Sequence, residues 1–278
     1  MVTVGLSLLA ALCYGLGGFL GGLNSRRSSV LQMLPSVIIA GAITLTLSIP
    51  FLGAKFSAEA IKVAIILTIF GSVAYYAVYR AISIGPMGIA SAIIAVTSAS
   101  IPFLFGIIRG ERLSNLGLTG AGLALVSILL VCKSKEDAKH PVTSKMVGIA
   151  FVAGLLAAGF SITLASAPKT SGIAVFAFSR WLQAILAIGM LIFLRKKLDF
   201  KAVNLKLTIS NGVIDTLASI LFLAATRTGA LSLVAVISNM SPAITLAIAH
   251  FVVHERVEKH QIVGMLGACA SVTMLSLS

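Results

Sequence analysis

Apolar residues in this sequence recur in runs of about 20, the length that a helix needs to cross the hydrocarbon core of a bilayer. Of the 278 residues, 58% are hydrophobic and only 10% are charged. Ordinary soluble domains carry roughly 25% charged residues, so a soluble enzyme, a disordered chain and a disulfide-rich secreted fold are excluded. We predict an all-α membrane protein with ten transmembrane helices, near 2–22, 31–52, 60–82, 87–108, 114–132, 146–165, 172–194, 207–225, 229–251 and 260–277.

The two halves of the sequence are related to each other. Only the segment 133–145 has the composition of a soluble loop, which predicts a linker between a first repeat at 1–132 and a second at 146–278. A shift of 144 residues lays Glu111–Arg112 on Glu255–Arg256, and charged pairs are scarce in this chain. The same shift aligns Gly15 with Gly159, Gly120 with Gly264 and Ser127 with Ser271. Five spans per half would insert the second half upside down, so we predict a 5+5 inverted repeat, an architecture common in secondary transporters.

Several short motifs occur once in each half or at matching places. An early Tyr14–Gly15 step is followed by AISIGPMGIASAI at 81–93 and by AATRTGALSLVAVI at 224–237. Ser241–Pro242 and a Glu-Arg pair before a glycine-rich run complete the pattern. Over its whole length the chain resembles the EamA-type transporters of the drug/metabolite transporter superfamily. The resemblance implies ten helices around a central cavity, and export or uptake of small metabolites. The first copy departs from the pattern, because Ser98 stands at the place of Pro242.

The basic residues give a net charge of +13, but they cluster between the apolar runs. This distribution favours loops beside a membrane over a nucleic-acid surface, so we expect no nucleic-acid partner. The odd-numbered loops and their flanks carry more than twice as many Lys and Arg residues as the even-numbered ones. The positive-inside rule then places both termini outside. The family resemblance implies cytoplasmic termini, and the two interpretations stay open.

Only Arg180 and Asp215 are charged residues that lie well inside a predicted span, and Arg80 lies near a helix end. Charges at this depth are costly, and they usually face a cavity or a partner. The two residues lie at similar depth in consecutive antiparallel spans. They therefore form either a structural ion pair or part of a substrate or proton site, and both alternatives stay open.

Uncharged polar residues extend this site. Asn211, Asp215 and Ser219 share one helix face, since they follow i, i+4 spacing. The family resemblance implies a cavity between the first, third, fourth, sixth, eighth and ninth spans. The alternatives are an aromatic belt for Tyr79 and helix–helix contacts for the serines. The candidate substrate-binding residues are Tyr14, Tyr75, Tyr79, Ser98, Arg180, Asn211, Asp215, Ser219, Asn239 and Ser241.

The sequence holds no HExxH, CxxC or phosphate-binding-loop motif, and no paired catalytic groups in one membrane layer. We therefore expect no enzyme activity, no cofactor and no metal site. The hypothesis is a secondary transporter in the cell membrane that moves small organic metabolites, amino-acid-like or drug-like, by alternating access. Its expected partners are a small-molecule substrate and the lipid bilayer. The alternatives are a membrane channel or scaffold and a membrane-embedded lipid-modifying enzyme. The sequence does not determine substrate identity, direction of transport, proton coupling or oligomeric state.

Overall fold

The computed structural model describes residues 1–278 apart from 28, 86, 133–141, 196–203, 254–257 and 278. Within the described residues the chain is helical, with an isolated bridge between Ala54 and Gly172 as its one extended pairing. The α-helices are α1 (Val2–Arg27), α2 (Val30–Leu52), α3 (Ala58–Ile84), α4 (Met87–Ile108), α5 (Asn115–Cys132), α6 (Ser144–Ala165), α7 (Ala174–Phe193), α8 (Leu205–Thr228), α9 (Leu231–Ser238), α10 (Ser241–Val253) and α11 (Lys259–Ser276). A short 3₁₀ turn, η1 (Lys169–Ser171), precedes α7.

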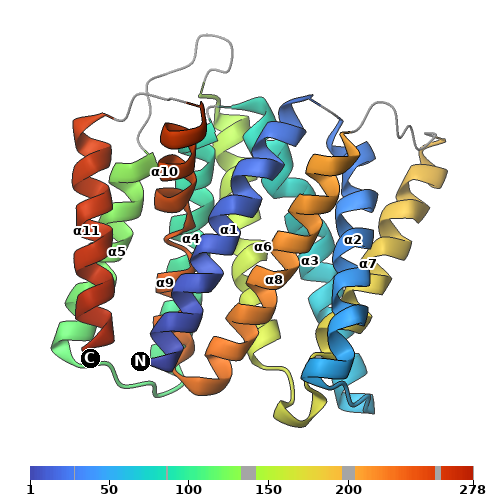
Figure 1. The fold of residues 1–278 in the computed structure, drawn as a ribbon, viewed down its shortest axis with the longest axis horizontal. Helices are drawn as coiled ribbons and strands as arrows, with labels where there is room; N and C mark the ends of the chain where they lie inside the picture. Colours follow the sequence, from blue (N-terminus) through green and yellow to red (C-terminus); the bar gives the residue numbers. More distant parts are fainter. Residues whose placement is uncertain (28, 86, 133–141, 196–203, 254–257, 278) are drawn as a thin grey trace.

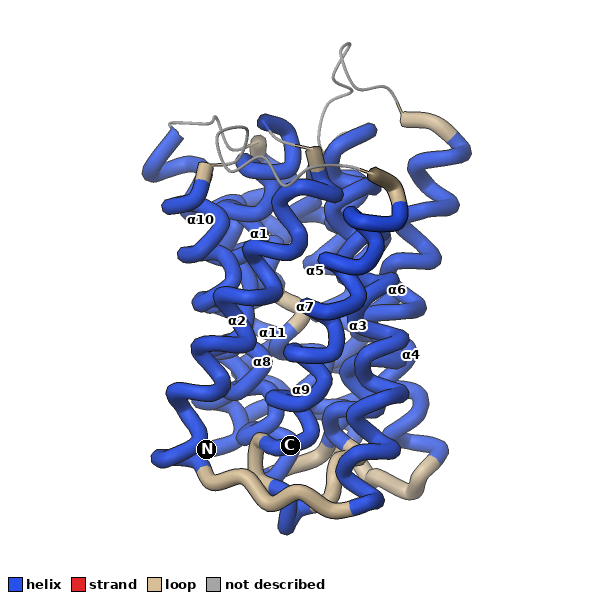
Figure 2. Tube along the Cα trace, turned by 90° about the vertical axis from the view of Figure 1, so that its right-hand side faces the viewer, coloured by secondary structure: helices blue, strands red, loops and turns tan. Residues whose placement is uncertain are grey.

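The helices run side by side between two ends of the molecule, and the start of α1 lies at the same end as the end of α11 (Figures 1 and 2). Seven of the helices in the described part are long and apolar enough to cross a membrane. Two further apolar stretches, Asn115–Val131 and Leu231–Thr245, are shorter. The fold is thus the all-helical membrane type that the apolar runs predict, and several helices extend a few residues beyond the predicted spans because their polar end residues are also helical.

The predicted span 229–251 is not one continuous helix. It divides into α9 and α10, and Asn239 ends α9 with φ −80° and ψ 4°. Proline cannot donate a backbone hydrogen bond, but it is tolerated in the first turn of a helix, and Pro242 is the second residue of α10. Pro102 instead lies inside α4, which continues past it. The two halves therefore differ where the sequence replaces Pro242 by Ser98.

The middle of the bundle is formed by the helices of six predicted spans, of which the ninth is divided into α9 and α10. Figure 1 shows α5 and α11 at one edge and α2 and α7 at the other. Between these edges, α1 packs against α8, α9 and α10, and α3 and α4 pack against α6. The central segments are those of the predicted first, third, fourth, sixth, eighth and ninth spans.

Contacts between the two halves occur in matching pairs, in which a helix of the first half and its predicted equivalent in the second half exchange places. The contact of α1 with α8 has its counterpart in α6 with α3, and the contact of α2 with α8 has its counterpart in α7 with α3. At the edge, a Cβ on Gly120 would lie 3.3 Å from the Ser271 carbonyl oxygen, and a Cβ on Gly264 would lie 2.9 Å from the Ser127 carbonyl oxygen. A two-fold relation between the halves would produce this reciprocity. The 5+5 inverted repeat itself stays a prediction, tested by superposing 1–132 on 145–278.

Candidate functional site

An ion pair between α7 and α8 lies inside the bundle. Arg180 Nη2 is 2.8 Å from Asp215 Oδ2, and the side chains are 1% and 18% exposed respectively. The two helices are consecutive in the chain, but α7 packs against α2 and α3, whereas α8 packs against α1 and α2. The arginine side chain passes Gly41 of α2, where a Cβ would lie 3.6 Å from Arg180 Nε. The predicted ion pair is therefore formed, because the long side chain of Arg180 extends past α2 to reach Asp215.

Tyr75 of α3 completes this charged group. Its hydroxyl donates a hydrogen bond to Asp215 Oδ2 and accepts one from Arg180 Nη2. The guanidinium carbon of Arg180 lies 4.7 Å from the centre of the Tyr75 ring and 5.1 Å from that of Phe176. Such cation–π contacts favour a desolvated cation, so the aromatic rings help to offset the cost of burying Arg180.

Neutral polar groups surround the remaining edge of the arginine. Its Nη1 donates to Gln183 Oε1 at 3.5 Å, and Gln183 Nε2 donates to Ser179 Oγ at 2.9 Å. Thr68 Oγ1 of α3 donates to Ser179 Oγ at 3.1 Å. From the sequence, Gln183 could be either a packing residue or part of a cavity wall; Ser179 and Thr68 gave no signal, because serine and threonine also occur in membrane helices as simple packing residues. Phe176 gave no signal beyond its hydrophobicity.

The polar face of α8 meets tyrosines from the first half of the chain. Asn211 Nδ2 donates to the Tyr79 hydroxyl at 2.9 Å, and the hydroxyls of Ser219 and Tyr14 lie 3.1 Å apart. Tyr79 is 6% exposed, which favours the site over the aromatic belt that was its alternative. The i, i+4 spacing on α8 thus brings seven of the ten candidate residues into one region: Tyr14, Tyr75, Tyr79, Arg180, Asn211, Asp215 and Ser219.

The other three candidates belong to a second polar group on α4, α9 and α10. Ser98 Oγ donates to Asn239 Oδ1 at 2.7 Å, and Asn239 Nδ2 donates to the Ala235 carbonyl. The Ser241 carbonyl accepts from Thr245 Oγ1 at 3.1 Å. A Cβ on Gly15 of α1 would lie 3.0 Å from that same carbonyl oxygen. These contacts hold the break between α9 and α10 against α1 and α4.

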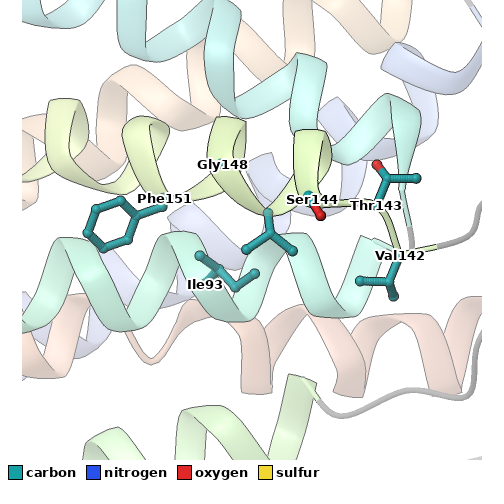
Figure 3. Close-up of a pocket in the computed structure, with 7 residues that line it drawn as sticks. Ile93, Val142, Thr143, Ser144, Gly148 and Phe151 are labelled. Atoms are coloured by element: carbon teal, nitrogen blue, oxygen red, sulfur yellow. The ribbon is translucent and has the colours of Figure 1, made fainter.

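A hollow of about 560 Å³ lies elsewhere, beside the start of α6 (Figure 3). It contains none of the ten candidate residues, and its walls are mostly apolar. Its lining residues are Ile93, Val142, Thr143, Ser144, Val147, Gly148 and Phe151. The Thr143 hydroxyl already accepts a hydrogen bond from the Met146 amide as the cap of α6. None of these described lining residues is charged, so they offer little chemistry for recognising a polar solute.

Potential metal ligands do not gather in the described part of the chain, where no group of three His, Cys, Asp or Glu side chains could hold an ion. Cys13 and Cys269 are free thiols. The chemistry that the described site offers is therefore one ion pair, three phenol groups and several neutral amides and hydroxyls.

A helical bundle with this length, hydropathy and buried charged group defines a multi-pass membrane protein. The family model for the EamA-like transporter family matches residues 1–133 and 144–277. The chain belongs to this family, which is a transporter family of the drug/metabolite transporter superfamily. A search of curated proteins gave no match. One solved crystal structure of a protein has a TM-score of 0.77 and 15% sequence identity to this chain, over 99% of this chain and 96% of the other. At that identity the likeness shows the fold alone.

Proposed function

We propose that this protein is a secondary transporter of the cell membrane that moves a small organic metabolite through a site at Arg180, Asp215 and Tyr75. The observation that carries the proposal is the ion pair in the interior of the bundle, bridged by a tyrosine hydroxyl. Ionisable residues inside a membrane protein are expensive and usually mark a pathway for a solute or a proton. Membership of a transporter family supports this proposal.

The unequal exposure of the pair supports a role in solute binding. Arg180 is 1% exposed and Asp215 is 18% exposed, while Tyr75 is half-buried. A purely structural pair gains nothing from leaving one partner accessible, because water weakens its attraction. The carboxylate edge and the Tyr75 phenol are therefore the groups that a solute or a proton would reach.

Alternating access is the mechanism that the packing supports best. The contacts between the halves occur in exchanged pairs, as described above, so an inward and an outward arrangement can use equivalent surfaces. The hydrogen bonds of Tyr14, Tyr75 and Tyr79 connect the first half of the chain to α7 and α8 in the second half. We propose that the two halves rock against each other around these contacts.

A transport screen in proteoliposomes tests the proposal. Purified protein is reconstituted, a panel of small amines, amino acids, carboxylic acids and neutral solutes is tested for uptake, and each solute is tested with and without a pH gradient. We expect at least one solute to be transported, and Asp215→Asn and Tyr75→Phe to reduce its rate. Glu59→Gln is the matched control, because Glu59 is an exposed carboxylate in the first turn of α3. Equal transport by Asp215→Asn and wild-type protein would remove this site from the transport pathway.

A further inference from the structure

We propose that the solute carries a protonated amino group, which Asp215 binds near the phenol groups of Tyr14 and Tyr75. This inference rests on the proposed function and adds the chemical class of the substrate. The charge of the solute follows from which partner of the ion pair is accessible for binding. Although the pair is neutral as a whole, it presents its two charges very unequally.

The guanidinium of Arg180 is closed to solutes by burial: both Nη atoms have hydrogen-bond partners, and Nε, which has none among the described residues, is buried beside Gly41. Its Nη2 donates to Asp215 and Tyr75, its Nη1 faces Gln183, and the rings of Tyr75 and Phe176 cover the guanidinium. With 1% of its side chain exposed, no edge of the guanidinium is open to a carboxylate or phosphate. Anion recognition by arginine uses two parallel N–H donors on one edge, and burial leaves this arginine no such edge accessible.

In the described part of the chain, Asp215, in contrast, keeps a free hydrogen-bond acceptor and part of its surface accessible. Both hydrogen bonds to its carboxylate reach Oδ2, and within the described residues Oδ1 accepts none. Its side chain keeps 18% of its surface accessible. A protonated amine supplies the N–H donors that Oδ1 lacks, in a charge-assisted hydrogen bond. The ion pair therefore presents a negative end to an incoming solute.

Two tyrosines lie near that carboxylate. Tyr75 bonds to it directly, and Tyr14 reaches the same turn of α8 through Ser219, whose hydroxyl also donates to the Asp215 carbonyl at 3.1 Å. Both tyrosines are half-buried, so each leaves part of its surface open. Tyrosine rings attract cations through their faces and not carboxylates; Tyr75 already covers Arg180 with its ring, and the half-buried Tyr14 ring offers a second such surface to an ammonium group. Carboxylate and rings together favour an amine.

Three probes with one ring and different charge test the inference: benzylamine as the cation, benzyl alcohol as the neutral analogue and benzoate as the anion. Binding is measured as a shift in Tm of the purified full-length protein. We expect benzylamine alone to raise the Tm of the wild-type protein, and Asp215→Asn to weaken its binding by at least about 10-fold. Asp215→Glu keeps the charge and should keep the preference for the amine. Glu59→Gln is the control for a general loss of negative charge.

The wild-type comparison alone can overturn the proposal, so it does not depend on whether Asp215→Asn folds. Absence of benzylamine binding, or equal binding of benzoate, contradicts it. An unchanged preference for benzylamine in Asp215→Asn also contradicts it. If the proteoliposomes transport only anions or neutral solutes, the transporter stands and the amine inference fails. If benzylamine binds through Asp215 but nothing is transported, the binding site stands and the transport function fails.

Discussion

Removing one partner of the Arg180–Asp215 pair should destabilise the protein by different amounts depending on which partner is lost. Asp215→Asn leaves a guanidinium that is 1% exposed, with the Tyr75 hydroxyl and the Gln183 side chain as its hydrogen-bond acceptors. An uncompensated buried charge of this kind costs about 3–5 kcal/mol. Arg180→Gln leaves a carboxylate that is 18% exposed and still bonded to Tyr75. Water and the phenol then reduce the cost to about 1–3 kcal/mol.

Thermal unfolding of the purified variants in detergent, followed by circular dichroism, measures this asymmetry. We expect the order wild type, Arg180→Gln, Asp215→Asn from highest to lowest Tm. The double variant should recover part of the loss, because it buries no unpaired charge, and residues in direct contact couple by about 0.5–3 kcal/mol.

The control is Glu59→Gln, which should leave Tm close to wild type. Additive effects of the two substitutions would refute the reasoning, since they would mean that the two side chains do not depend on each other. Equal losses for the two single variants would refute the asymmetry drawn from their exposures. Asp215→Asn with unchanged or higher Tm and lost pH-dependent transport would instead identify Asp215 as a free proton site.

Three further substitutions test other contacts by the same Tm measurement. Glu111 accepts from the two backbone N–H groups at the start of α9, both at 2.9 Å, so Glu111→Ala should cost about 1–2 kcal/mol; no change would mean that this cap is not used. Gly264→Leu should destabilise by about 1–3 kcal/mol because its Cβ would meet α5, whereas Gly122→Leu, with open space around it, should not; equal effects would contradict the packing. Tyr79→Phe removes the acceptor of Asn211 and should cost about 1–3 kcal/mol, and a neutral result would mean that water replaces the phenol.

The sequence allowed most of the fold and the charged pair to be predicted, for two physical reasons. A bilayer accepts only long apolar helices, so span positions follow from hydropathy alone. Charges are so rare inside those spans that Arg180 and Asp215 had few possible partners. Pro102 and Pro242 both predict a kink in their helices, but the sequence did not distinguish them, although only Pro242 lies in the first turn of a helix and follows a break.

The partners of Arg180 show what sequence alone could not supply. Helix-face spacing ordered the polar residues of α8, since i, i+4 neighbours share a face in any helix. No such rule relates Gln183 to Arg180 in function, or places Phe176 beside a guanidinium. Their roles depend on how α7 is rotated against α2 and α3, and that rotation comes from packing across the bundle.

The division of the site between the two halves suits the proposed rocking mechanism. Arg180 and Asp215 both belong to the second half, so the proposed rocking would keep their charge–charge contact within one half, whereas Tyr14, Tyr75 and Tyr79 come from the first half. Movement of one half against the other would therefore break neutral hydrogen bonds to tyrosine and leave the ion pair closed. A hydrogen bond contributes a net of about 0.5–1.5 kcal/mol, while opening a buried ion pair costs about 3–5 kcal/mol. The phenols can exchange their partners for solute or water at small cost, so a bound amine on Asp215 would change the balance between the two arrangements without exposing Arg180.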